Sequence, residues 1–271
     1  MDWKKATISN NFMFRLVMEK QELCKPLIER ILDIKISKIV YLEPEKNLEA
    51  KLLSKGVRLD IYVEDEAGVA YDIEMQIGSQ YKDYLGYRTR YYQSMMDNDA
   101  LKKGELYSKL RKSYIIFICL FDPFDKGWGR YTFNTYCNED KNLQLDDGVT
   151  KVFLNVNGDK HRVSRELANL MEYIATGKVE DEFTEELESA VESFRADDGK
   201  ERLYMTFQQT IMEHEMMAEQ RGEARGRKES IIQMVLNMLK HNMSIEDIAN
   251  VSELSVAEIN SMLKNAPAVQ P

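Results

Sequence analysis

Four polar residues with the chemistry of a metal-dependent hydrolase lie in two neighbouring segments of the chain. The segment R-L-D-I-Y-V carries Asp60, and the segment Y-D-I-E-M-Q carries Asp72, Glu74 and Gln76. Polar and apolar residues alternate in both segments, which is typical of β-strands with one face in a core and one face open. We therefore expect Asp72, Glu74 and Gln76 to share one face of their strand.

The two segments predict a β-hairpin over residues 57–78, because E-D-E-A-G between them supplies the turn. Two registers are open: residue numbers that sum to 134 place Asp60 opposite Glu74, and a sum of 132 places Asp60 opposite Asp72. In both registers two carboxylates meet with their side-chain bases about 5 Å apart. Such a pair repels unless a cation lies between the charges, and oxygen ligands without sulfur suit Mg²⁺ or Mn²⁺. The alternative is an amphipathic hairpin whose polar face is only solvated.

Composition and length are those of a soluble globular protein that can bury a full core. The chain has 271 residues, of which 44% are hydrophobic and 31% are charged. Its longest apolar run, residues 114–121, is too short to span a membrane, and the first residues do not read as a signal peptide. Three scattered cysteines (Cys24, Cys119 and Cys137) predict neither a disulfide framework nor a zinc site. We expect a cytoplasmic protein.

The charge of the chain is negative overall but unevenly distributed. The net charge of −9 argues against non-specific attraction of the whole molecule to nucleic acid. Residues 82–112, however, hold eight basic and four acidic side chains, whereas residues 178–198 hold two basic and nine acidic ones. A local basic surface can therefore coexist with an acidic chain.

A helix is predicted over residues 83–102, directly after the hairpin, and carries two arginines that are suited to phosphate. Arg88 and Arg90 follow the acidic strands closely in sequence, and guanidinium groups bind phosphate oxygens in a bidentate way. A stripe of tyrosines on the same helix is expected to lie in the core with its hydroxyls at the rim: Tyr84, Tyr87 and Tyr91.

Further segments supply the elements that must hold these residues. The run S-Y-I-I-F-I-C-L-F over residues 113–121 predicts a central strand covered on both faces. Other strands are predicted at residues 37–42, 127–138 and 150–156. Helices are predicted at residues 11–33, 164–176 and 182–194, followed by a long helical region over residues 200–241 whose continuity Gly222 and Gly226 leave open. Two short helices then begin at apparent capping boxes, Ser244 with Asp247 and Ser255 with Glu258.

In this order the segments resemble the PD-(D/E)XK nuclease superfamily, and within it the transposase-like branch of recombination-promoting nucleases. The resemblance covers most of the chain. It rests on N-N-F-M-F-R-L-V, R-L-D-I-Y-V, Y-D-I-E-M-Q, R-T-R-Y-Y-Q-S-M-M-D, Y-I-I-F-I-C-L-F-D-P-F and the small C-terminal helical module. It implies an α/β, restriction-endonuclease-like fold with a mixed central sheet flanked by helices and a helical C-terminal region.

The resemblance also implies roles for the hairpin residues. Asp60 and Glu74 would be metal-binding and catalytic carboxylates, and Gln76 occupies the position where the superfamily name has lysine. The implied cofactor is Mg²⁺, with Mn²⁺ as a substitute, and Arg88 or Arg90 would contact substrate phosphate. Asp72 is either a third acid or a solvated neighbour. Glu29 is either the helical carboxylate that some members add or a surface charge.

The expected function is metal-dependent cleavage of DNA in a recombination or mobile-element setting. The alternatives are a catalytically silent DNA-binding protein on the same fold and a helical assembly protein. We expect a nuclease-like domain over residues 1–178, an acidic and then long helical segment over 179–241, a helix-turn-helix-like module over 242–266 and a disordered tail over 267–271. That module would contact DNA or serve as a structural tail, and the C-terminal helices would form a homodimer.

Overall fold

The computed structural model describes residues 2–48 and 57–265 of the chain. They form two compact units, which meet at residues 202 and 203. The expected disordered tail over residues 267–271 lies outside the described residues. Among the helices of the described ranges, none is both long and apolar enough to cross a membrane.

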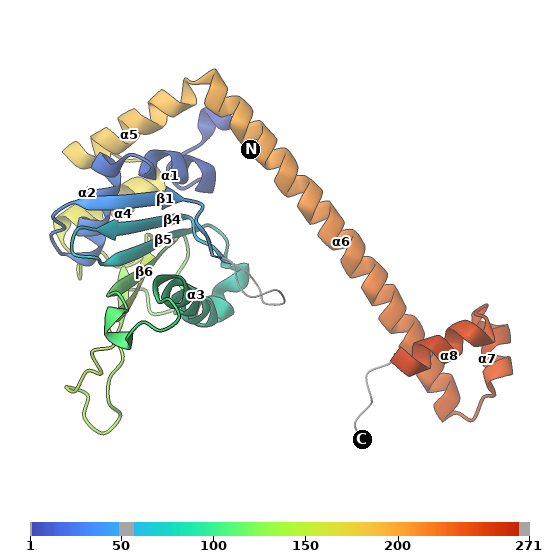
Figure 1. Ribbon diagram of the computed structural model, residues 1–271. Coiled ribbons are helices and arrows are strands. Elements are labelled where there is room, and N and C mark those ends of the chain that lie inside the picture. The colour runs from blue at the N-terminus through green and yellow to red at the C-terminus, as the bar shows by residue number, and fades with distance from the viewer. Residues whose placement is uncertain (1, 49–56, 266–271) are drawn as a thin grey trace. The chain divides into compact units, whose positions relative to one another are not determined.

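A mixed six-stranded sheet forms the centre of the first unit (Figure 1). Its strands lie in the order β1-β4-β5-β6-β8-β7, with β5, β6 and β8 parallel and the other neighbours antiparallel. The bounds are β1 Ile39–Pro44, β4 Ile61–Asp65, β5 Ala70–Gln76, β6 Ser113–Cys119, β7 Arg130–Phe133 and β8 Val149–Asn155. A separate two-stranded sheet pairs β2 Asn47–Leu48 with β3 Val57–Arg58. The predicted mixed central sheet is confirmed.

Helices cover both faces of this sheet (Figure 1). One face carries α1 Asn11–Met18, α2 Gln21–Leu32, α4 Arg165–Thr176 and α5 Glu182–Arg195, which pack on one another. The other face carries α3 Leu85–Ala100, which follows a 3₁₀ turn at Ser79–Tyr84. Two further 3₁₀ turns lie at Trp3–Lys5 and Tyr107–Lys109. The predicted α/β architecture is therefore confirmed.

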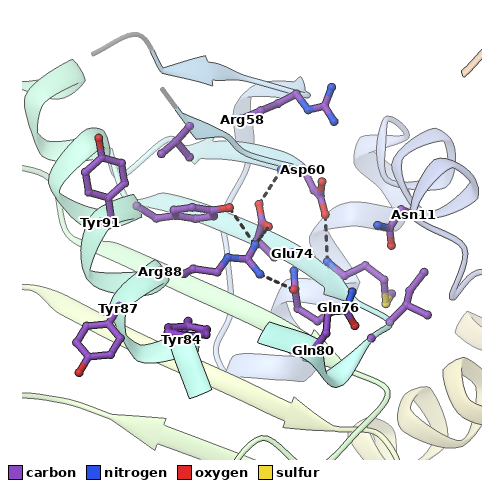
Figure 2. Close-up of a pocket in the computed structure, with 15 residues that line it drawn as sticks. Asn11, Arg58, Asp60, Glu74, Gln76, Gln80, Tyr84, Tyr87, Arg88 and Tyr91 are labelled. Atoms are coloured by element: carbon purple, nitrogen blue, oxygen red, sulfur yellow. Dashed lines mark hydrogen bonds and ion pairs between the residues drawn. The ribbon is translucent and has the colours of Figure 1, made fainter. Parts of the chain in front are cut away.

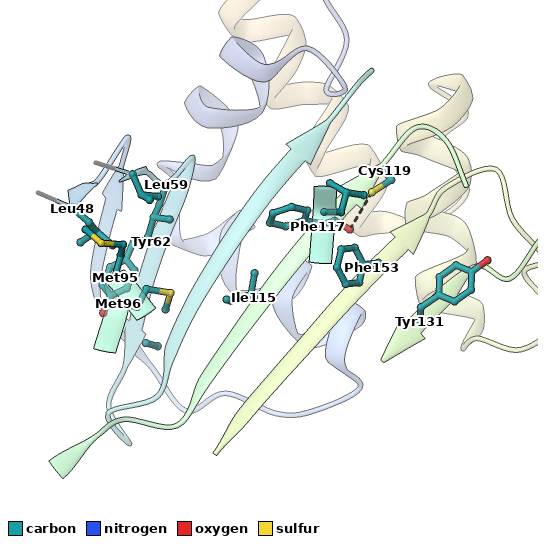
Figure 3. Packing of buried hydrophobic residues seen from close by; sticks show 13 residues of the cluster. Leu48, Leu59, Tyr62, Met95, Met96, Ile115, Phe117, Cys119, Tyr131 and Phe153 are labelled. Atoms are coloured by element: carbon teal, nitrogen blue, oxygen red, sulfur yellow. Dashed lines mark hydrogen bonds between the residues drawn. The ribbon is translucent and has the colours of Figure 1, made fainter. Parts of the chain in front are cut away.

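Strand β6 explains why the sheet needs helices on both sides. Its apolar run leaves no polar face, so a helical layer must exclude water from each side. Towards α3 its Phe117 packs edge-on against Phe153 of β8, within a cluster that includes Leu85 and Met96 of the helix (Figure 3). Ile116 of the opposite face is also fully buried. The prediction of a central strand covered on both faces is confirmed.

The β4–β5 hairpin adopts one of the two expected registers. Ile61 pairs with Ile73, so paired numbers sum to 134. The first arm is not one strand, because β3 and β4 are separated by a bend at Asp60. The expectation of an open polar face is wrong: Asp72 and Glu74 are 0% and 3% exposed, since α3 packs over that face.

The start of α5 is fixed by a network around Asp181. Its carboxylate accepts hydrogen bonds from Arg30 Nη1 at 2.7 Å, Asn169 Nδ2 at 2.9 Å and the Thr184 backbone N–H at 3.0 Å. Burial acts to raise the pKa of Asp181, but these hydrogen bonds outweigh it and lower the pKa to about 2. The charged carboxylate therefore ties α5 to α2 and α4.

Asp181→Asn is expected to lower the free energy of unfolding by about 1 kcal/mol near pH 7, after allowance for partial solvent screening. Because the folded pKa is below the ordinary value of 3.8, the stabilisation is present above about pH 4 and is lost as the pH falls towards 2. Urea unfolding at several pH values measures the difference. Glu185→Gln, at an exposed position of the same helix, is the control. If the difference in the free energy of unfolding between the wild type and Asp181→Asn does not become smaller below pH 4, this electrostatic account is contradicted.

The second unit contains most of one long helix and two short ones. Helix α6 runs from Asp198 to Lys240 without a break at either glycine. Helices α7 Ile245–Ser252 and α8 Val256–Asn265 follow, and a small core joins α6, α7 and α8 through Val235, Ile248 and Ile259. The predicted capping box at Ser255 is confirmed, because its hydroxyl accepts from the Glu258 N–H and the Glu258 carboxylate accepts from the Ser255 N–H. At Ser244 the hydroxyl accepts from the Asp247 N–H and donates to the Asp247 carboxylate, so the serine is the predicted N-cap.

Candidate active site

A pocket of about 900 Å³ opens at the carboxyl end of β5, beside α3 (Figure 2). Its lining combines the end of β5 and the bend before β4 with one face of α3 and the first residue of α1. Asp60, Glu74, Gln76 and Arg88 all contribute to it. The fold thus brings four of the residues singled out from the sequence into one cavity.

Asp60 and Glu74 each accept a backbone hydrogen bond from the segment that carries the other acid. Glu74 Oε1 accepts from the Asp60 N–H at 2.8 Å, and Asp60 Oδ2 accepts from the Met75 N–H at 3.3 Å (Figure 2). The bend at Asp60 allows this, because the residue has left the ladder that pairs β4 with β5. Each strand therefore orients the carboxylate of the other.

Three acids share this small, poorly solvated volume. Burial, followed by the neighbouring charge of Asp60, raises the pKa of both Asp72 and Glu74 well above the ordinary range. Burial likewise raises the pKa of Asp60, against the backbone hydrogen bond from Met75 and the positive charge of nearby arginines. A nearby cation would favour the charged forms of all three.

Asp72 is the least compensated of these acids. The side chain is fully buried, and neither carboxylate oxygen has a hydrogen-bond partner. The interpretation of Asp72 as a solvated neighbour is therefore wrong. A buried carboxyl group without a hydrogen bond lowers the stability of the fold. The packing of the surrounding sheet and helix must offset this cost.

Arg88 of α3 reaches across the pocket to the end of β5. Its Nη1 donates to Gln76 Oε1 at 2.6 Å, and its Nη2 lies 3.4 Å from Glu74 Oε2 and donates to the Tyr92 hydroxyl at 3.0 Å. The guanidinium also lies over the ring of Phe117, 5.1 Å from its centroid. Aromatic contact and directed hydrogen bonds fix a permanent positive charge beside Gln76.

Two other residues weighed from the sequence lie elsewhere. Arg90 is exposed, does not belong to the pocket lining, and places its guanidinium over the ring of Tyr87. Glu29 also lies outside the lining, and its Oε1 accepts from the Ile36 N–H at 2.7 Å after the end of α2. The surface-charge interpretation of Glu29 is wrong, because only 13% of its side chain is exposed.

Two of the three tyrosines of α3 do not lie in the core as expected, whereas Tyr91 is partly buried and packs against it. Tyr84 and Tyr87 are 60% and 63% exposed and line the pocket. The helix instead buries a face on which Thr89 donates to the Gly86 carbonyl at 3.0 Å and Gln93 accepts from Ser113 at 3.0 Å. The apolar Leu85, Met95 and Met96 complete this buried face of the helix.

Sequence reasoning missed some residues of the pocket. Asn11 at the start of α1 and Gln80 in the 3₁₀ turn contribute to its lining, as does the exposed Arg58 of β3. Arg58 lies two residues before Asp60, and alternation along that segment is the one signal that could have identified it. Gln80 follows Gln76 by four residues, in the turn after β5, whereas Asn11 comes from a distant element that only the tertiary structure brings to the site.

Residues 9–230 match the PD-(D/E)XK nuclease family transposases when the sequence is compared with protein families. The chain belongs to this family. A comparison with curated proteins and a comparison with solved structures each find no match. Membership of the PD-(D/E)XK transposases implies DNA as a substrate or partner. The assignment of Glu74 and Gln76 to the E-x-K part of the superfamily motif, with glutamine in place of lysine, stays a prediction.

PD-(D/E)XK nucleases generally use divalent metals, so the donors present must be compared with that requirement. Across residues 2–48 and 57–265, no group of three or more His, Cys, Asp or Glu residues is arranged to hold a metal ion. Asp60 and Glu74 nevertheless offer oxygen ligands in a pocket where burial disfavours their charged forms. One or two carboxylates, completed by water and substrate phosphate, form a usual Mg²⁺ site. The residues present fit the metal on these grounds.

Proposed function

We propose that this protein is a metal-dependent DNA endonuclease that hydrolyses phosphodiester bonds in a recombination or mobile-element setting. One observation supports this function. Asp60 and Glu74 each accept a backbone hydrogen bond from the segment that carries the other acid, in the same pocket as the Arg88 guanidinium. A structural hairpin would gain nothing from two buried acids. A phosphodiesterase needs acids at this position to hold a cation and a fixed positive charge for the phosphate.

Asp60 and Glu74 would hold the Mg²⁺ ion, or Mn²⁺ in its place. When bound, the ion polarises the scissile phosphate and lowers the pKa of a coordinated water. Arg88 would bind a phosphate oxygen through its guanidinium, which stays charged throughout. Since Gln76 Oε1 already accepts from Arg88, the Gln76 Nε2 donors remain to orient the attacking water or a phosphate oxygen.

Gln76 and Arg88 together would perform the role of the lysine that the superfamily motif has at residue 76. Glutamine alone supplies no charge, but the Arg88 Nη1 lies 2.6 Å from its side-chain oxygen. The pair therefore provides both the cation and the hydrogen-bond donors of a lysine from two side chains. Arg90 would then act, if at all, away from the reacting phosphate.

The direct test is a nicking assay on supercoiled plasmid with the purified full-length chain. We expect nicks in the presence of Mg²⁺ or Mn²⁺ and none in excess EDTA, because the acids cannot stabilise the transition state without the ion. Salt-dependent DNA binding without turnover in either metal would contradict the proposal and favour the catalytically silent alternative. A chain that neither binds nor cleaves DNA would favour the helical assembly alternative, in which the C-terminal helices form a homodimer.

A further inference from the structure

Two exposed tyrosines at the pocket have no role in the catalysis proposed above. Tyr84 and Tyr87 lie near the start of α3, beside the strand end that carries the acids, and are 60% and 63% exposed (Figure 2). Tyr84 is the N-cap of α3 and makes no side-chain capping hydrogen bond, although Ser, Thr, Asp and Asn are the residues that stabilise this position. Neither burial in the core nor helix capping accounts for the pair.

Glu74 lies deep in the pocket, while Asp60 is half-buried at its lining. Glu74 is 3% exposed at the pocket lining. The volume of about 900 Å³ falls within the roughly 300–1,000 Å³ of pockets that enclose small molecules. A nucleotide that has left its stack fits a space of this size, and its adjoining phosphate can then approach Glu74.

The charge of the lining also favours unpaired nucleotides over duplex DNA. Its charged residues are two arginines and two acids: Arg58, Arg88, Asp60 and Glu74. Duplex binding depends mainly on the number of phosphates that a protein neutralises, and this lining neutralises few. Stacking of bases on aromatic side chains adds affinity that does not come from phosphate neutralisation and that tolerates any sequence.

We propose that the pocket binds unpaired nucleotides of DNA, with Tyr84 and Tyr87 stacking on bases while the adjoining phosphate reaches Asp60, Glu74 and Arg88. The substrate class is therefore single-stranded or locally unwound DNA. This inference rests on the proposed nuclease function, because it assigns the substrate of that same pocket. The binding step itself requires neither metal nor turnover, and it can be measured separately.

The test is fluorescence anisotropy with the full-length protein in EDTA, so that no cleavage occurs. The probes are a labelled single-stranded oligonucleotide, the same sequence as a duplex, and a single strand with abasic sites. We expect the intact single strand to bind most tightly. Tyr84→Ala and Tyr87→Ala should each weaken its binding by roughly 5- to 150-fold, the equivalent of about 1–3 kcal/mol per stacked base.

Matched variants separate stacking from a general loss of structure. Tyr84→Phe and Tyr87→Phe keep the ring and should bind the single strand as the wild type does. Tyr107→Ala removes a tyrosine that is 83% exposed but lies outside the pocket lining, and should have no effect. Far-ultraviolet circular dichroism confirms that each alanine variant is folded.

Equal affinity for duplex and single strand, unchanged binding by both alanine variants, or equal binding of the abasic strand would each overturn the inference. The two proposals fail separately. A protein that binds single strands through these tyrosines but never nicks plasmid DNA supports the binding inference and contradicts the nuclease function. A protein that nicks plasmid DNA without preference for unpaired nucleotides supports the nuclease function and contradicts the binding inference.

Discussion

Asp60→Asn is expected to lower the Mg²⁺-dependent nicking rate by about 10³-fold or more. The asparagine keeps the size of the side chain and an oxygen that accepts from the Met75 N–H, so the bend before β4 should persist. It removes the negative charge that would hold the ion. Loss of several kcal/mol of transition-state stabilisation corresponds to this factor, since each 1.36 kcal/mol changes the rate tenfold. Plasmid nicking, measured over a range of enzyme concentrations, gives the ratio.

The control for Asp60→Asn is Glu66→Gln, which removes an acid from the exposed turn of the same hairpin and should leave nicking unchanged. A thermal melt separates loss of function from loss of fold. The variant should melt no lower than the wild type without metal, because it removes one charge from a repelling, poorly solvated group of acids. Mg²⁺ should raise the melting temperature of the wild type and not of the variant. Full activity in Asp60→Asn would assign the nicking to a contaminant.

The part of this site that the sequence predicted is the part encoded by local periodicity. Alternation along two short segments predicted that Asp60 meets a carboxylate of the facing segment, but it left open whether that acid is Glu74 or Asp72. The structure brings Asp60 to Glu74 through a backbone hydrogen bond rather than through the strand ladder. The continuous apolar run predicted the central strand, since only a strand covered on both faces needs no polar side. The serine capping boxes predicted the starts of α7 and α8 for the same reason, as they depend on residues only three positions apart.

The predictions that failed depended on what packs over each surface. Alternation shows which side chains share a face but not whether another element covers it, so the burial of Asp72 and Glu74 under α3 could not be anticipated. The tyrosines were placed in the core because they are the largest apolar groups of their helix. The helix instead buries Leu85, Met95 and Met96, together with the hydrogen-bonded Thr89 and Gln93. Local rules are broken most often at sites of this kind, where function and stability make different demands.

The contact between Arg88 and Gln76 also has no local signature, because it joins residues from a helix and a strand across the pocket. It bears on how a chain with glutamine at this position could supply the positive charge of the lysine in the superfamily motif. Sequence alone leaves open which residue carries the positive charge, whereas the structure places the Arg88 guanidinium within hydrogen-bond distance of the Gln76 oxygen. If Arg88 supplies that charge, restoration of the lysine should be harmful.

Gln76→Lys is accordingly expected to lower the nicking rate by about 10²-fold, even though it recreates the motif of the superfamily. Lysine has no acceptor for the Arg88 Nη1, which now donates to Gln76 Oε1 at 2.6 Å, and its ammonium would repel the guanidinium. Displacement of one fixed donor at a phosphate costs about 2.7 kcal/mol or more, which is this factor in rate. The measurement is the single-turnover nicking rate at saturating Mg²⁺.

Two further variants identify the cause of that loss. Gln80→Lys introduces the same charge at another glutamine of the pocket lining, and should have a much smaller effect because Gln80 lies in the 3₁₀ turn. Arg88→Ala alone should be as impaired as Gln76→Lys. The double variant should be less impaired than the two single losses combined, because removal of the guanidinium relieves the repulsion and lets the lysine supply the charge. A Gln76→Lys enzyme as active as the wild type would show that Arg88 does not fill the role of the missing lysine.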